Sequence, residues 1–171
     1  MSERPSLEKL YLSHKDRIKA ANDVGKILKR QVEQVKRVVL FGSVARNTDG
    51  PDSDVDMLVT YWGVPSPEND NFFHGQVIDT LKTAGISLGN PKAKKESANK
   101  GKVTLQTISE VALTHPNLYL PPFEFTLIGF LEKVSQDGKV LFLRSLKGRD
   151  LLVEMTIEAT IDKIQSGLDR K

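Results

Sequence analysis

The segment from Leu40 to Val59, LFGSVARNTDGPDSDVDMLV, holds the residues best suited to chemistry. Asp54 and Asp56 lie in a stretch of strand composition, and side chains alternate faces along a strand, so both carboxylates are expected on one face. At a separation of about 6.6 Å and an effective dielectric constant of about 20, they repel by about 2.5 kcal/mol, which calls for a cation. Carboxylate oxygens with open positions for substrate phosphates are typical of Mg²⁺ sites.

Gly42 and Ser43 form the second half of the pattern, with ten residues between Ser43 and Asp54. A glycine lets the backbone approach phosphate oxygens, and the serine hydroxyl and the amides that follow can donate hydrogen bonds to them. A tight turn beside a solvated strand end is the alternative for either half alone. The two halves together, each flanked by an apolar strand, favour an anion cradle beside a metal site.

This combination resembles the signature of the minimal nucleotidyltransferases of the DNA polymerase β superfamily: Gly-Ser, about ten residues, then Asp-x-Asp. The resemblance implies that Asp54 and Asp56 hold two Mg²⁺ ions and that Gly42 and Ser43 bind the triphosphate of a nucleoside triphosphate. Arg46 stands at the arginine of the family's GSxAR turn and is expected to bind nucleotide. Asn47 replaces the glycine that more often follows that arginine.

The family often adds a third carboxylate on a later strand, as a base toward the acceptor hydroxyl. The best match to that strand is VTLQ at residues 103–106, where Thr104 stands in place of the aspartate. Neither Thr104 nor Gln106 can act as a base. Asp79, on a predicted helix, and Glu110, past the predicted strand end, are the nearest carboxylates in the sequence.

The reaction that the resemblance implies is Mg²⁺-dependent transfer of a nucleoside monophosphate, with AMP from ATP as the favoured case. Small members often lie beside a helical HEPN partner in prokaryotic toxin–antitoxin pairs and adenylylate the toxin, so a HEPN-type protein is an expected partner. Two alternatives stay open. One is a small-molecule nucleotidyltransferase of the aminoglycoside-modifying kind, for which a homodimer could complete the acceptor site; the other is a non-catalytic nucleotide-binding module, which Thr104 favours.

The order of the expected helices and strands predicts an α/β (α+β) domain with a small mixed sheet and flanking helices. The resemblance implies that this is the polymerase-β-like nucleotidyltransferase fold. Apolar spacing from Leu7 to Val35 predicts a leading helix capped by Ser6, which Gly25 could divide. Strands are expected at 37–41, 54–61, 103–108 and 140–143, and helices at 68–83, from Pro121 and Pro122 to about 138, and at 150–171. The expected domain is 1–149, with 1–36 as leading helix or helices and 150–171 as a helical extension.

The composition suits one globular domain: 171 residues, 39% hydrophobic, with no cysteine for disulfides or thiolate metal sites. No apolar stretch approaches the roughly 18 residues of a membrane span, and the first residues carry no apolar signal region, so a cytoplasmic setting is expected. The net charge of +3 is concentrated at residues 91–102, which carry five lysines and one glutamate. We expect a mobile solvated loop there, with a phosphate-facing lid as the alternative, and nucleic acid is not the expected partner.

Other residues carry weaker signals. His14, His74 and His115 show no metal-ligand spacing, and each is expected to be a surface or core histidine. Tyr61 and Trp62 follow the aspartate strand, where packing is the expected role and stacking on a nucleobase is the alternative.

Overall fold

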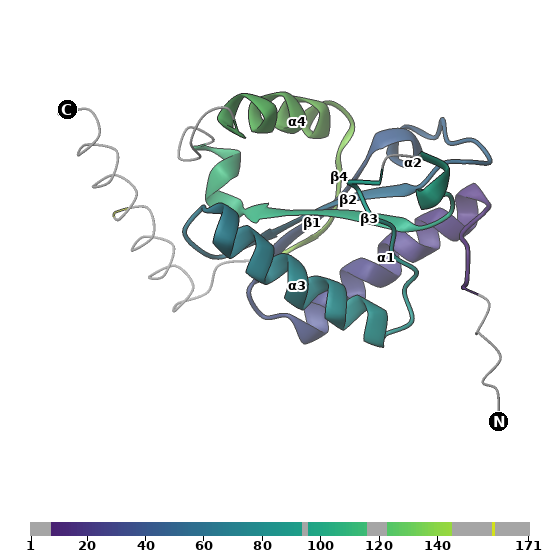
Figure 1. Ribbon diagram of the computed structural model, residues 1–171, viewed down its shortest axis with the longest axis horizontal. Helices are drawn as coiled ribbons and strands as arrows, with labels where there is room; N and C mark the ends of the chain where they lie inside the picture. The colour runs from purple at the N-terminus through teal and green to yellow at the C-terminus, as the bar shows by residue number, and fades with distance from the viewer. Residues whose placement is uncertain (1–7, 94–95, 116–122, 145–158, 160–171) are drawn as a thin grey trace.

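A four-stranded mixed sheet is the centre of the fold. The computed structural model describes residues 8–93, 96–115, 123–144 and 159. The strands are β1 (Val35–Phe41), β2 (Val55–Tyr61), β3 (Val103–Ser109) and β4 (Lys139–Leu143), in the order β3-β2-β1-β4. β1 is antiparallel to β2 and β4, whereas β2 and β3 are parallel. The predicted α/β fold with a small mixed sheet is confirmed (Figure 1).

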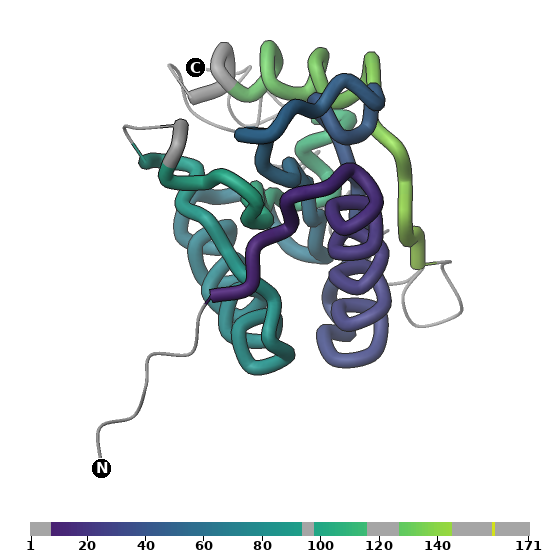
Figure 2. The backbone as a smooth tube through the Cα atoms, turned by 90° about the vertical axis from the view of Figure 1, so that its right-hand side faces the viewer, coloured from purple at the N-terminus to yellow at the C-terminus, as the bar shows by residue number. Residues whose placement is uncertain are grey.

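Helices cover both faces of the sheet. α1 (His14–Gln31) and α3 (Pro67–Thr83) lie side by side on one face, and α4 (Phe123–Asp137) lies on the other (Figure 2). Three short helices occupy connections: α2 (Gly42–Arg46), η1 (Glu96–Asn99) and η2 (Glu110–Leu113). None of the described helices combines the length and apolar character that a membrane span requires.

The alternation of strand side chains builds one apolar cluster on each face. On β2, Met57 packs in the cluster that contains α1 and α3, and Leu58 packs in the cluster that contains α4. Because side chains alternate, Asp54 and Asp56 share the face of Leu58. The two aspartates therefore lie on the α4 side of the sheet, at the end where β2 begins.

The leading helix is shorter than the sequence spacing predicts. It begins at His14, where the hydroxyl of Ser13 accepts a hydrogen bond from the amide of Asp16. Residues before it are held differently, since the amide of Tyr11 donates to the carbonyl of Gly101 at 2.7 Å. Ser6, the predicted cap, lies outside the described residues.

The other end and the middle of the helix also differ from the prediction. Val35 belongs to β1 rather than to the helix. Gly25 does not divide the helix; it is buried there, and a β-carbon at this position would lie 3.7 Å from the Leu141 side chain. An added β-carbon would thus make an ordinary van der Waals contact with β4, and Gly25 packs against β4 inside a continuous helix.

The later elements agree closely with the sequence. α3, β3 and β4 fall where the patterns place them, and the helix predicted to end near residue 138 is α4, ending at Asp137. The predicted start of that helix at Pro121 and Pro122, the predicted domain boundary at 149 and the predicted helix 150–171 lie outside the described residues.

A buried ion pair ties α1 to the connection between α2 and β2. Arg17 and Asp49 are each 2% exposed, with 2.6 Å between Nη1 and Oδ2. Arg17 also donates to the carbonyl of Pro51 at 3.3 Å, and the His14 ring lies 2.5 Å from Asp49 Oδ1. Burial alone would raise the pKa of Asp49, but the hydrogen bonds from Arg17 and His14 outweigh it and hold the pKa below its usual value. The pair fixes the turn that leads to Asp54.

We expect Asp49→Asn to lower the free energy of unfolding by about 3 kcal/mol, because it leaves the guanidinium of Arg17 buried without its counter-charge. Urea denaturation at neutral pH measures this. Asp23→Asn is the matched control: its partner Lys19 is 70% exposed, so the pair it breaks is solvated and no resolvable change is expected. Equal losses in the two variants would contradict a structural role for the buried pair.

Candidate active site

Asp54 and Asp56 come together at one hydroxyl group. Thr104 on β3 lies opposite Asp56 on β2 in the parallel register. Its Oγ1 is 3.1 Å from Asp54 Oδ2 and 3.0 Å from Asp56 Oδ1. A threonine hydroxyl has a single proton, so it can donate to only one of the two carboxylates at a time. The shared face predicted from the Asp-x-Asp spacing is thus present in the fold.

Gly42 brings the backbone against Asp56 from the opposite side. β1 is paired with β2 so that Phe41 faces Asp56, and Gly42 follows with a φ of +75°. A β-carbon on Gly42 would lie 2.5 Å from Asp56 Oδ2. Both the left-handed backbone and the contact exclude a larger residue, so this position has to be glycine.

Ser43 and Asn47 complete the turn. Ser43 follows Gly42 in the first turn of α2, and its hydroxyl donates only a long hydrogen bond, 3.4 Å, to Ser53 Oγ. Asn47 caps α2 with a φ of +60°, a conformation that glycine adopts readily and asparagine tolerates. Asn47 therefore adopts a conformation that would also suit the glycine more usual in the family.

Arg46 is placed beside the carboxylates but is already paired. Its guanidinium forms an ion pair with Asp137 at the end of α4, and the Arg46 side chain is 52% exposed. Its charge partly opposes the rise in the pKa of Asp56 that burial and Asp54 cause. The second oxygen of Asp137, Oδ1, is buried and has no hydrogen-bond partner among the described residues. A nucleotide that binds Arg46 must compete with Asp137, which lies 91 positions away in the sequence and which sequence reasoning missed.

Neither of the other acidic residues considered in the sequence substitutes for the third carboxylate. Glu110 follows β3 at the end opposite to Thr104 and accepts hydrogen bonds from Arg37, at 2.7 Å, and from Thr60. Asp79 is exposed on α3, on the other face of the sheet. Within the described residues, Thr104 is therefore the β3 group that meets the two aspartates.

The two carboxylates cannot both be charged at low cost. Burial and the neighbouring charge of Asp54 raise the pKa of Asp56 to about 6, against the opposing effects of the Thr104 hydrogen bond and Arg46. No group of three or more His, Cys, Asp or Glu side chains that could hold a metal occurs within the described residues. A pair of carboxylates with room for other ligands fits Mg²⁺, which usually takes one or two protein carboxylates together with water and substrate phosphates.

A cavity of about 560 Å³ opens beside Asp54. Two connections form its walls: the residues from Gly50 to Ser53, and part of the lysine-rich segment, namely Pro91, Ala93 and Asn99. The segment is not wholly solvated, since Asn99 is buried and the amide of Gly101 donates to the carbonyl of Ser53 at 3.1 Å. The lysine-rich segment thus borders the opening to the aspartates.

The weaker sequence candidates lie elsewhere. Tyr61 is buried, stacks on Phe73 and donates to Asp70 at 2.6 Å, so the packing role is confirmed for it. Trp62 lies under the ammonium group of Lys36, 4.6 Å from the ring centre. His14 contacts Asp49, and the ring of His74 contacts the Thr107 hydroxyl at 3.1 Å. None of these contacts involves Asp54 or Asp56.

The raised pKa of Asp56 predicts a pH-dependent stability in the metal-free protein. Folded Asp56 holds its proton up to about pH 6, whereas an unfolded aspartate loses it at about pH 3.9. The stabilisation is therefore fully present below about pH 3.9 and is lost as the pH rises through 6. Relative to Asp56→Asn, the free energy of unfolding of the unmodified chain should fall by up to about 3 kcal/mol between pH 3.5 and 8.

Urea denaturation in the presence of a chelator measures this difference. Parallel pH profiles for the unmodified chain and Asp56→Asn would contradict the shifted titration.

Two curated relatives share part of their length with the chain. Aminoglycoside nucleotidyltransferase (4') of a Bacillus species is 26% identical over 152 residues, 87% of this chain and 54% of the relative. Aminoglycoside nucleotidyltransferase (4') of Staphylococcus aureus is 28% identical over 133 residues, 76% of this chain and 47% of the relative. The chain thus spans about half the length of these relatives.

Solved structures resemble the chain more distantly. A provisionally assigned nucleotidyltransferase of Sulfolobus solfataricus has a TM-score of 0.46 at 15% identity, over 77% of this chain and 84% of that one. A chain from the complex of the tri-AMPylated Shewanella oneidensis HEPN toxin with its MNT antitoxin has a TM-score of 0.35 at 13% identity, over 90% and 93%. Both TM-scores are too low to support a shared substrate or partner.

The family model of the nucleotidyltransferase domain matches residues 22–110. The matched range covers just over half of the chain and includes the Gly-Ser turn, both aspartates and Thr104. This match confirms the resemblance that the Gly-Ser and Asp-x-Asp motifs indicate. The chain therefore belongs to the nucleotidyltransferase domain family.

Proposed function

We propose that the protein transfers a nucleoside monophosphate from a nucleoside triphosphate, with ATP as donor, to the hydroxyl of an acceptor in a Mg²⁺-dependent reaction. The observation that carries this proposal is the convergence on Asp56: Gly42 approaches from β1, and Asp54 and Thr104 lie on the other sides. The glycine lets the backbone itself border the half-buried carboxylate pair, where a cation and phosphate groups would bind.

Each residue of the site has a distinct part in this proposal. Asp54 and Asp56 would hold Mg²⁺, which when bound supplies neutralisation of phosphate charge and orientation of the reacting groups. Gly42 gives the phosphates access to the backbone, and the Ser43 hydroxyl, free of any short hydrogen bond in the described structure, donates to a phosphate oxygen. Arg46 would bind the nucleotide after it exchanges Asp137 for a phosphate.

Two kinds of acceptor are compatible with this chemistry. A HEPN-type protein partner of a toxin–antitoxin pair follows from the resemblance of the motifs, and with it a cytoplasmic setting. An aminoglycoside-like small molecule is the rival acceptor, suggested by the names of the curated relatives. Since the chain spans about half of those relatives, that acceptor would need a further surface, which a homodimer could provide.

One observation favours a second function, nucleotide binding without turnover. Thr104 occupies the strand position facing Asp56, and a hydroxyl cannot take a proton from the acceptor at neutral pH. Binding and transfer therefore have to be measured separately.

The first test replaces the metal-binding carboxylates. Asp54→Asn or Asp56→Asn should reduce transfer of labelled adenylate from ATP by at least about 10³-fold, because each removes a charge that holds Mg²⁺. The assay offers a HEPN-type partner and an aminoglycoside panel as acceptors. Asp79→Asn is the matched control, since Asp79 is exposed on α3, on the other face of the sheet. Undiminished transfer by either of the first two variants would remove them from the metal site.

The second test concerns Thr104. A missing general base costs roughly 10² to 10⁴ in rate, so Thr104→Asp should raise turnover if the position serves the acceptor hydroxyl. Thr104→Val, which keeps the shape and removes the hydroxyl, should not. Calorimetry with ATP and Mg²⁺ distinguishes the two functions: binding without transfer in both the unmodified chain and Thr104→Asp supports the binding module. A fast unmodified chain that Thr104→Asp does not improve would show that the base lies elsewhere.

A further inference from the structure

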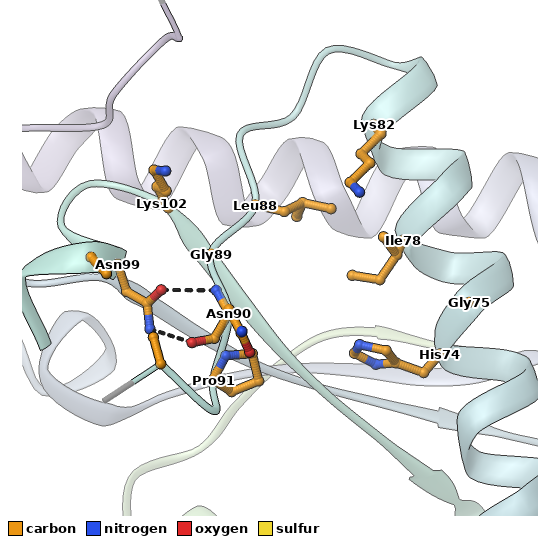
Figure 3. Close-up of a pocket in the computed structure, with 12 residues that line it drawn as sticks. His74, Gly75, Ile78, Lys82, Leu88, Gly89, Asn90, Pro91, Asn99 and Lys102 are labelled. Carbon is orange, nitrogen blue, oxygen red and sulfur yellow. Dashed lines mark hydrogen bonds between the residues drawn. The ribbon is translucent and has the colours of Figure 1, made fainter. Parts of the chain in front are cut away.

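A second cavity, of about 500 Å³, lies between α3 and the segment that leads into β3. Figure 3 shows Lys82 on α3 facing Lys102 across Leu88, with His74 pointing toward Pro91. No carboxylate is found among the described residues that line it. Lys102 pairs at 2.9 Å with Glu8, which is 53% exposed, whereas Lys82 forms no ion pair with the described residues. The cavity is therefore positively charged.

The wall of this cavity is built by a specific contact. The amide of Asn90 donates to Asn99 Oδ1, and Asn99 Nδ2 donates to the carbonyl of Asn90, both at 2.8 Å (Figure 3). Asn99 is 9% exposed, and a β-carbon on Gly89 would lie 2.5 Å from its side-chain oxygen. The two hydrogen bonds thus join Asn90, just before the lysine-rich segment, to Asn99 near its end. This part of the segment is a defined surface rather than a solvated loop.

The lining has two chemical parts. Ile78, Leu88, Pro91 and two alanines give an apolar floor, and Lys82, Lys102 and His74 give a rim of hydrogen-bond donors and positive charge. Burial, together with the charge of Lys92, lowers the pKa of His74, so its ring is neutral at pH 7 and can donate or accept. An apolar floor with a few placed charges is typical of sites for small ligands, and the volume lies within their usual range of about 300–1,000 Å³.

The cavity borders the opening at Asp54, although its α3 wall lies on the face of the sheet opposite to Asp54 and Asp56. Gly42 and Ser43, the proposed phosphate-binding residues, lie on the β1 side of Asp56, and Thr104 lies on the β3 side. The wall residues Pro91, Ala93 and Asn99 also line the opening at Asp54.

We propose that this cavity binds a small phosphorylated molecule of nucleotide size, with its phosphate at Lys82 and Lys102 and its uncharged part against Ile78 and Leu88. The binding itself does not depend on the proposed transfer reaction. The positive charges of its rim disfavour a polycation such as an aminoglycoside in this cavity.

The test is a titration of the full chain with AMP, in a chelator and without ATP, followed by the ring ¹⁵N signals of His74. AMP should shift these signals and bind at least about fivefold more tightly than adenosine, because only AMP carries the phosphate. Lys82→Ala should remove that preference. Lys133→Ala, on α4 and exposed, is the matched control and should leave it unchanged. Asp56→Asn should also bind AMP normally, which separates this site from the proposed metal site.

Three results would overturn the proposal. Equal affinities for AMP and adenosine would show that no phosphate is recognised. Loss of binding in Ser43→Ala but not in Lys82→Ala would place AMP at the Gly-Ser turn instead. Binding of polyadenylate through Lys82, with none of AMP, would indicate a nucleic-acid surface rather than a small-molecule site. Failure of adenylate transfer with AMP binding intact would count against the proposed function and not against this cavity.

Discussion

The placing of two carboxylates beside one another on β2 is the constraint on which the site depends. Asp54 and Asp56 lie within reach of the same threonine hydroxyl, and the backbone of Gly42 closes the other side of Asp56. Such a pair is costly without a cation, as the raised pKa of Asp56 records. The surrounding elements therefore have to hold the pair against its own repulsion. A carboxylate that could swing into solvent would escape this cost and would not form a preorganised metal site.

The connections that lead into β2 and β3 hold the two carboxylates in place. The amide of Val55, next to Asp54, donates to the carbonyl of Lys102 at 2.9 Å, and the amide of Gly101 donates to the carbonyl of Ser53. The Arg17–Asp49 pair fixes the same connection from α1. Apolar clusters on both faces of the sheet then make β2 rigid. Three consecutive parts of the sequence therefore act as one rigid unit in the fold: the glycine turn, the connection held by Arg17, and the two aspartates.

The local periodicity of the sequence was enough to predict much of this arrangement. It could not predict contacts between residues that are far apart in the chain. The spacing of two residues placed Asp54 and Asp56 on one face, and the apolar stripe located α4 correctly. The predicted start of α1 was wrong. The hydroxyl of Ser13 caps the helix, and the amide of Tyr11 donates a hydrogen bond to the distant carbonyl of Gly101 instead of joining the helix. Ion pairs such as Arg17–Asp49 and Arg46–Asp137 join residues far apart in the chain and leave no periodic signal.

Thr104 sets a balance between the resting protein and the reaction. A third carboxylate at this position would add a negative charge to a pair that already shares one positive partner, the threonine proton, and would raise the cost of the metal-free fold. A threonine donates instead, which lowers that cost, but in the proposed transfer it cannot accept a proton from the acceptor. Threonine in place of a third carboxylate thus favours stability of the metal-free protein over the rate of the proposed transfer. A site of this kind suits an acceptor that needs little help to lose its proton, or a nucleotide that is held and not consumed.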